Sequence, residues 1–238
     1  MSDELNVADF DRDEAVAEAI DGLDSAGATR GGLFRRAGMA AGGLGVAAAI
    51  VPGLFGGTAN AREGGSKKND VKILNFALTL EYLEAAFYAA ADQAKYADAD
   101  IAAAAKTLAS HEAAHVAALK KVLGSAAVKP PTVNLDTVGK LLADQNTFIK
   151  TAAAIEPVGT AAYAGAGPYI NNLAIVRAAL SIHSVEAQHA AYTASIVKFK
   201  GIDASADPVP NAFNPAFSFA KTIKTVTALN VVKGDLQP

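Results

Sequence analysis

Apolar residues recur at steps of three and four residues through most of residues 70–200, which is the period of one face of an α-helix. A Lys-Pro-Pro break at residues 129–131 divides this range into two halves, because proline cannot continue a helix. Each half holds two predicted helices, and the four helices start near residues 70, 98, 134 and 168. The pattern therefore predicts an all-α fold, an antiparallel four-helix bundle made of two helical hairpins.

Residues 1–61 have the pattern of an export signal rather than of a folded domain. Arg35-Arg36 precedes a glycine- and alanine-rich apolar run, Ala37–Phe55, and Ala59-Asn60-Ala61 provides a small-x-small cleavage site. Arginines just before a weakly apolar run resemble a twin-arginine (Tat) signal. We expect cleavage after Ala61 and a location in the periplasm, outside the cell or on the cell envelope. The alternative is that the uncleaved run anchors the chain in a membrane.

Two further segments flank the predicted bundle. Residues 62–69 form a short polar linker that contains Gly64-Gly65-Ser66. Residues 201–238 form a C-terminal extension, which is rich in prolines and which we expect to wrap the bundle. Within this extension, residues 217–232 have a helical pattern, but residues 222–232 are equally compatible with a strand. The sequence leaves these two alternatives open.

Composition and charge restrict the chemistry of the chain. Alanine is abundant, which favours close-packed helices. The formal net charge of −3 is too small for a nucleic-acid-binding surface. The chain contains no cysteine, which excludes a disulfide framework, thiolate-bound zinc and cysteine-ligated iron–sulfur clusters. A metal site in this chain is therefore left with oxygen and nitrogen ligands.

Two Glu-x-x-His motifs, Glu112–His115 and Glu186–His189, lie inside the predicted second and fourth helices. Residues i and i+3 share a face of a helix, about 5–6 Å apart at Cβ, so both side chains of a motif can reach one metal ion. The predicted first and third helices each carry a single glutamate on the apolar face, Glu81 and Glu156. Each single glutamate precedes the motif of the next helix by 31 or 30 residues, which indicates an internal duplication.

Four inward-facing carboxylates without matching lysines or arginines would repel one another and carry a large desolvation cost. Two divalent cations would offset the four negative charges, and the two imidazoles would complete the coordination. One glutamate from each of two helices and a Glu-x-x-His from each of the other two is the ligand pattern of a dimetal site in a four-helix bundle. Oxygen and nitrogen ligands favour iron or manganese, and zinc also binds such sites in vitro.

The chain resembles the ferritin-like superfamily, in the branch of exported ferritin-like proteins that includes plant desiccation-related proteins. The resemblance covers about residues 70–200 and includes Asn-Phe-Ala-Leu-Thr-Leu-Glu-Tyr-Leu-Glu at residues 75–84. It implies a site for two iron ions. The ligand roles that it implies are Glu81 and Glu156 as terminal ligands, Glu112 and Glu186 as bridges, and His115 and His189 as ligands of one metal each. A tyrosine follows each terminal glutamate by seven residues, and the resemblance implies that Tyr88 and Tyr163 donate hydrogen bonds to the ligands or act in redox chemistry.

Three other residues lie near these motifs. Glu84 lies one helical turn after the first single glutamate, and it either shares the site or lies at its edge. His111 points about 100° away from Glu112, which predicts a surface or boundary position. His183 lies one turn before the second motif, where packing or support of a ligand is expected rather than ligation.

The leading hypothesis is a non-haem dimetal oxidoreductase in which ferrous iron reduces dioxygen or hydrogen peroxide, a ferroxidase or peroxidase that limits oxidative damage. A dimanganese catalase-like enzyme is the enzymatic alternative, since the same ligands suit manganese. The non-enzymatic alternative is a desiccation or stress protein in which metal only stabilises the bundle. A storage ferritin would need assembly into a cage, which the long C-terminal extension disfavours, whereas a homo-oligomer stays open.

Overall fold

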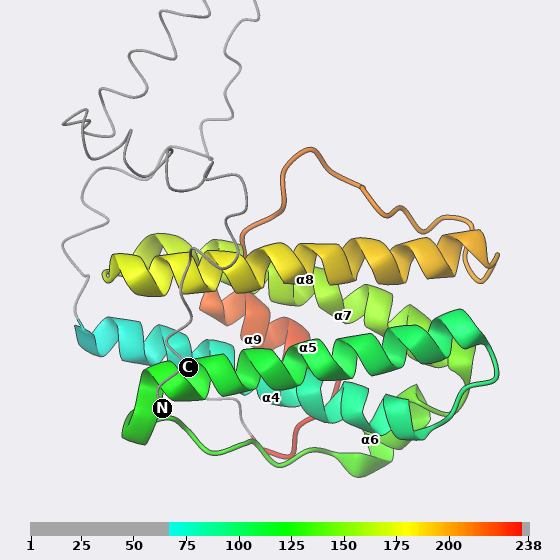
Figure 1. The fold of residues 1–238 in the computed structure, drawn as a ribbon, viewed down its shortest axis with the longest axis horizontal. Coiled ribbons are helices and arrows are strands. Elements are labelled where there is room, and N and C mark those ends of the chain that lie inside the picture. The colour runs from blue at the N-terminus through cyan, green and yellow to red at the C-terminus, as the bar shows by residue number, and fades with distance from the viewer. Residues whose placement is uncertain (1–66, 235–238) are drawn as a thin grey trace, which may run out of the picture. The chain divides into compact units, whose positions relative to one another are not determined.

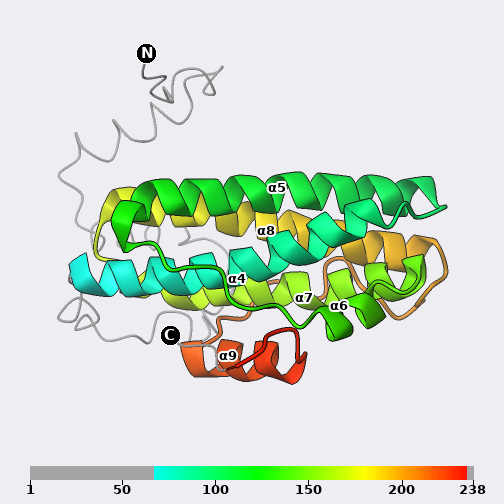
Figure 2. The same cartoon turned by 90° about the horizontal axis from the view of Figure 1, so that it is seen from below.

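The computed structural model describes residues 67–234, and the regular structure in this range is almost entirely helical. α4 packs along α5 and α7 packs along α8, so that two hairpins face each other (Figures 1 and 2). The predicted all-α bundle of two helical hairpins is confirmed. The helices are α4 (Lys67–Gln93), α5 (Ala99–Leu123), α6 (Leu135–Leu141), α7 (Gln145–Ala166), α8 (Leu173–Phe199) and α9 (Phe219–Ala228), with short 3₁₀ turns η3 (Gly124–Ala126) and η4 (Gly167–Tyr169).

The predicted export signal, residues 1–61, lies outside the described residues. So do residues 62–66 of the predicted linker, whereas the last three residues of that linker belong to α4, which begins at Lys67. Between residues 67 and 234, none of the helices combines the length and the apolar character that crossing a bilayer requires.

Two buried apolar clusters occupy opposite ends of the bundle. One joins the C-terminal halves of α4 and α8 to the N-terminal halves of α5 and α7, and it contains Leu108 and Phe148. The other joins the N-terminal halves of α4 and α8 to the C-terminal halves of α5 and α7, and it contains Leu78 and Ile182. Because α5 and α7 contribute the same end to each cluster, they run in the same direction. Residues 124–144 therefore form a crossover that returns along the length of the bundle (Figure 2).

The single helix predicted from about residue 134 is wrong, because α6 and α7 are separate helices in this range. The carboxylate of Asp144 accepts hydrogen bonds from the backbone N–H groups of Asn146 and Thr147 at 2.9 and 3.0 Å. These are the contacts of a helix N-cap, so a new helix starts after Asp144. The break separates α6, which belongs to the crossover, from α7, which belongs to the bundle (Figure 2).

α9 covers the bundle on the side of α4 and α7 (Figure 2). Val226 of α9 packs in an apolar cluster with Leu80 of α4 and Ala162 of α7. After α9, Val232 forms a single antiparallel β-bridge with Val133 of the crossover. The helical alternative is therefore right for Phe219–Ala228, and strand pairing of the extension is limited to this bridge within the part of the chain that the structure describes.

The segment that leads into α9 lies directly on the backbone of α7. The N–H group of Phe217 donates a hydrogen bond to the carbonyl oxygen of Ala161 at 2.9 Å. A Cβ atom on Gly165 would lie 1.9 Å from the carbonyl oxygen of Phe217. Since this neighbour is backbone rather than a flexible side chain, only glycine fits at residue 165.

We expect Gly165→Ala to lower the free energy of unfolding by about 1–3 kcal/mol, the usual cost of forcing extra atoms into a packed contact. Gly139→Ala is the matched control, because Gly139 also lies in a helix and an added Cβ there meets nothing within 4 Å. The control should be neutral or more stable by up to about 1 kcal/mol, since alanine is the better helix former. Urea denaturation measures both variants, and equal stabilities would refute the close contact.

Candidate metal centre

Four glutamates lie between the two apolar clusters, one on each helix of the bundle. Glu81 is on α4, Glu112 on α5, Glu156 on α7 and Glu186 on α8. Each of the four is 0% exposed to solvent. The helical period places them inward, because each occupies a position of the otherwise apolar face. Four carboxylates that have lost their hydration need compensating partners in the protein or a bound cation.

The imidazole of His115 faces three of these carboxylates. Its Nδ1 atom lies 3.0 Å from Glu112 Oε2, 3.0 Å from Glu186 Oε1 and 3.2 Å from Glu81 Oε2. These four residues each offer a ligand atom within 4.8 Å of the others. A ring nitrogen carries at most one hydrogen, so Nδ1 can donate fully to only one of the three oxygens. A cation at the point of convergence would satisfy all of them.

His189 repeats this arrangement at the other half of the centre. Its Nδ1 atom lies 3.1 Å from Glu112 Oε1, 3.5 Å from Glu156 Oε2 and 3.6 Å from Glu186 Oε2. Glu112 and Glu186 therefore face both histidines, each through its two different oxygen atoms. Glu81 and Glu156 face one histidine each. The centre consists of two similar halves that share two carboxylates.

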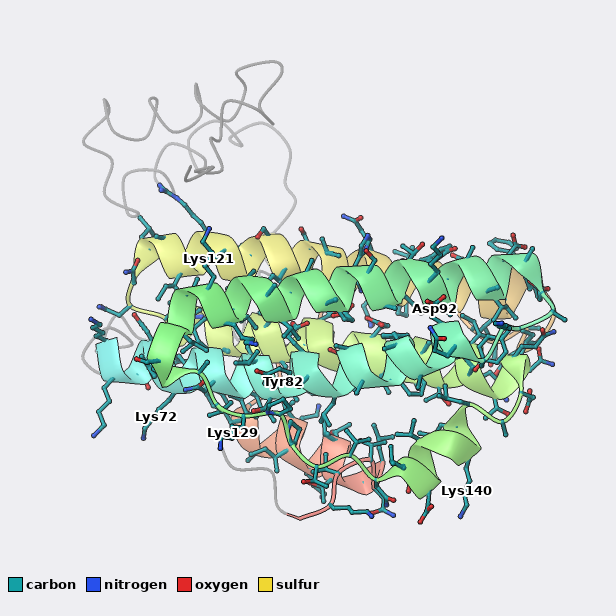
Figure 3. All side chains as sticks on the ribbon, turned by 60° about the horizontal axis from the view of Figure 1, so that its bottom comes forward. Lys72, Tyr82, Asp92, Lys121, Lys129 and Lys140 are labelled. Atoms are coloured by element: carbon teal, nitrogen blue, oxygen red, sulfur yellow. The ribbon has the colours of Figure 1, made fainter. Side chains whose placement is uncertain are left out.

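Several buried atoms of this centre lack a hydrogen bond, although some lie within ion-pair distance of a neighbour. Among the described residues, five buried atoms have no hydrogen-bond partner: Glu112 Oε1, Glu156 Oε2, both carboxylate oxygens of Glu186, and His189 Nδ1. The buried residues of the described range include no lysine or arginine, and Lys72, Lys121 and Lys140 project away from the bundle (Figure 3). Two divalent cations would neutralise the four carboxylates, and carboxylate and imidazole donors suit such ions. The residues present could therefore hold two metal ions.

Two buried tyrosines connect the hairpins through the single glutamates. The hydroxyl of Tyr163 on α7 donates to Glu81 Oε1 on α4 at 2.6 Å, and the hydroxyl of Tyr88 on α4 donates to Glu156 Oε1 on α7. Each tyrosine thus orients the glutamate of the opposite hairpin. The other carboxylate oxygen of that glutamate faces a histidine. Burial and the adjacent carboxylate raise the pKa of both phenols well above the usual value, so both remain protonated donors.

The centre holds protons when no metal is bound. Burial raises the pKa of Glu81 and of Glu156 to about 8. Burial has the same tendency at Glu112, but the imidazoles of His115 and His189, 3.0 and 3.1 Å from its two oxygens, outweigh it and lower the pKa to about 2. The carboxylates also overcome the effect of burial on the imidazoles, and they raise the pKa of His115 to about 12 and of His189 to about 11. Metal binding at neutral pH must therefore release protons.

Glu84 is a fifth carboxylate at the edge of the centre. It is half-buried on α4, and its carboxylate offers a ligand atom within 4.8 Å of those of Glu156 and Glu186. Burial, followed by the neighbouring carboxylates, raises the pKa of Glu84 well above its usual value. The spacing of one turn after Glu81 is the sequence signal for this position.

His111 is exposed, as predicted, but it also contacts the centre. Its Nδ1 lies 2.9 Å from Nε2 of His189, and the two rings stack with centroids 5.1 Å apart. His111 therefore supports His189 from the outer side while Nδ1 of His189 faces the carboxylates. The sequence did not reveal this contact, because the partner lies on α8. His183 is half-buried. Within the described residues, it is not a member of any cluster of carboxylates and histidines that could hold a metal ion.

Fold and site together define a ferritin-like helical bundle with a buried centre that could hold metal ions. The family model of the ferritin-like domain matches residues 69–198, and the chain belongs to this family. Among curated proteins, no sequence matches this chain at a significant level. The predicted membership of the ferritin-like superfamily is confirmed, whereas the exported, desiccation-related branch stays a prediction.

We expect the metal-free protein to lose stability as the pH rises. Between the unfolded pKa of 4.5 and the folded pKa of about 8, Glu81 and Glu156 hold protons only in the folded state. His189 behaves in the same way between its unfolded pKa of 6.5 and its folded pKa of about 11. The free energy of unfolding should therefore be highest at the acidic side of this window and fall by up to about 1.4 kcal/mol per pH unit for each such proton.

Urea denaturation of the metal-free protein between about pH 5 and pH 9 measures this slope. The double variant Glu81→Gln, Glu156→Gln is the control, because it removes two of the three carboxyl groups whose pKa values are raised and should make the lower part of the curve less steep. A stability that stays constant or rises with pH in the metal-free parent would contradict the proton-holding centre.

We expect Tyr88→Phe and Tyr163→Phe each to weaken metal binding by about 10- to 100-fold, the usual loss when the hydrogen-bond partner of a ligand is removed. Tyr169→Phe is the control, because that side chain is 55% exposed and is not one of the two phenols that donate to the glutamates of the centre. Calorimetric titration with zinc, which has no redox chemistry, measures the affinity. Equal affinities of all three variants would show that the buried phenols do not orient the carboxylates.

Proposed function

We propose that this protein is a non-haem dimetal oxidoreductase that oxidises ferrous iron with dioxygen or hydrogen peroxide. The observation that supports this proposal is the arrangement of Glu112 and Glu186. Each presents one oxygen to His115 and the other to His189, at distances of 3.0–3.6 Å. Two ions that share these carboxylates would be close enough for one oxidant molecule to receive an electron from each.

Six side chains would hold the two ions, and their donor atoms favour iron or manganese over metals that need thiolate. Glu81 and His115 would hold one ion and Glu156 and His189 the other, with Glu112 and Glu186 shared between them. Zinc would fit the same donors without redox activity. Manganese is the alternative metal, and with it a catalase-like activity is the alternative function.

Ferrous iron, bound as substrate, supplies the electrons. Two ferrous ions and two protons convert one dioxygen to one hydrogen peroxide, or convert one hydrogen peroxide to two waters. Either reaction leaves two ferric ions. The protein excludes bulk water, because the four glutamates are fully buried. Tyr88 and Tyr163 hold the terminal glutamates in place. The protons that Glu81 and Glu156 hold in the metal-free state leave as the ions bind.

A protein that removes ferrous iron together with an oxidant would limit oxidative damage at its location. The predicted export signal would place this activity in the periplasm, outside the cell or on the cell envelope. This part of the proposal rests on residues 1–61, which lie outside the described residues.

Anaerobic titration of the metal-free protein with ferrous iron tests the centre. We expect the parent to bind two ferrous ions per chain. The double variant Glu112→Gln, Glu186→Gln should no longer bind two, because it removes the charges of both shared carboxylates while the side-chain volumes stay nearly constant. Asp136→Asn is the control, since it makes the same kind of change at an exposed position of α6. Two ions bound to the double variant would contradict the ligand assignment.

Rapid-mixing measurements on the iron-loaded protein test the reaction. We expect dioxygen or hydrogen peroxide to oxidise the iron at least about tenfold faster in the parent than in the Glu112→Gln, Glu186→Gln variant. Oxygen release from hydrogen peroxide by the manganese-loaded protein, without oxidation of ferrous iron, would instead support the catalase-like alternative. A rise in thermal stability with metal but no turnover with either oxidant would support the structural role.

A further inference from the structure

An apolar pocket lies beside the metal centre, between α4, α7, the crossover and α9. Its volume is about 60 Å³, and its lining includes Leu83, Phe87, Ile155 and Val226. An engineered cavity of about 150 Å³ lined by such side chains stays dry and binds benzene or xenon. The pocket between α4 and α9 has less than half that volume, so it has room for a small apolar molecule of only a few atoms.

The pocket ends at the carboxylates of the centre. Glu84 is the ionisable side chain of its lining, and the Glu84 carboxylate offers an atom within 4.8 Å of ligand atoms of Glu156 and Glu186. Gly159 of α7 lies at the same junction. A Cβ atom on Gly159 would lie 3.2 Å from Glu84 Oε1 and 3.6 Å from Glu186 Oε2, so the missing side chain lets both carboxylates approach α7 where the pocket meets the centre.

We propose that this pocket binds dioxygen and is the route by which dioxygen reaches the metal centre. The proposal rests on the proposed function and selects between its two oxidants. Transfer from water to an apolar pocket costs little free energy for dioxygen, which is apolar, whereas hydrogen peroxide would lose its hydrogen bonds with water. The side chains of the lining offer hydrogen-bonding atoms only at Glu84 and Thr151, which favours the apolar oxidant.

Xenon tests the pocket without any contribution from iron. Xenon is apolar and small, and its anomalous scattering locates it in a crystal. Crystals of the full chain held under xenon pressure should show a xenon atom beside Leu83 and Val158. A map with no xenon in this pocket would overturn the proposal.

Val158→Phe tests the route, because the larger side chain would fill the pocket from α7. We expect kcat/KM for dioxygen in ferrous oxidation to fall about tenfold or more, while oxidation by hydrogen peroxide and anaerobic binding of ferrous iron stay within about twofold of the parent. Val176→Phe is the matched control, since Val176 is a half-buried valine of α8 outside the lining. If Val158→Phe does not fold, Leu229→Phe fills the same pocket from the end of α9 and replaces it.

Equal values of kcat/KM for dioxygen in the Val158→Phe variant and the Val176→Phe control would overturn the route. Oxidation of ferrous iron by hydrogen peroxide alone in the parent would also overturn it, but would leave the proposed function standing. Absence of oxidation by either oxidant in the parent would overturn the proposed function and the route with it. These three results are distinct, so failure of the route can be told apart from failure of the proposed function.

Discussion

The neutralisation of four carboxylates that are buried together is the constraint on which the structure depends. An ionised carboxylate that is buried without a counter-charge costs several kcal/mol, and here all four are 0% exposed. Without metal, two imidazoles and the protons of Glu81 and Glu156 provide the balance, as the raised pKa values of about 8 indicate. Bound cations would replace those protons. Stability, pH dependence and metal affinity are therefore linked through the same charges.

The surrounding fold keeps these charges dry and in position. Apolar clusters close the bundle on both sides of the centre along its length. Tyr88 and Tyr163 each bind a glutamate of the opposite hairpin, so the two hairpins are joined at the centre itself. α9 adds a cover on the side of α4 and α7, and it leaves a small apolar pocket that ends at Glu84. The C-terminal extension therefore shapes the surroundings of the centre as well as the surface.

Much of this architecture could be predicted, because helical period and charge act locally along the chain. The 3.6-residue period placed Glu81 and Glu156 on inner faces, and the spacing of three residues brought each Glu-x-x-His pair to one side of a helix. The break at Asp144 was missed, because an aspartate in a helical pattern looks the same whether it caps a helix or lies on its surface. The contact of His111 was missed because its partner is 78 residues away in the sequence.

The sequence by itself determined four amphipathic helices and the inward positions of the carboxylates and histidines, since these follow from residue spacing within one helix. Only the tertiary structure decided which groups meet. Tyr88 lies two turns, about 10.5 Å along the axis, from Glu81, so its hydroxyl needs another partner. The crossover between parallel α5 and α7 supplies Glu156 as that partner. The sharing of Glu112 and Glu186 between two histidines likewise depends on how the hairpins pack, which no spacing within a helix can specify.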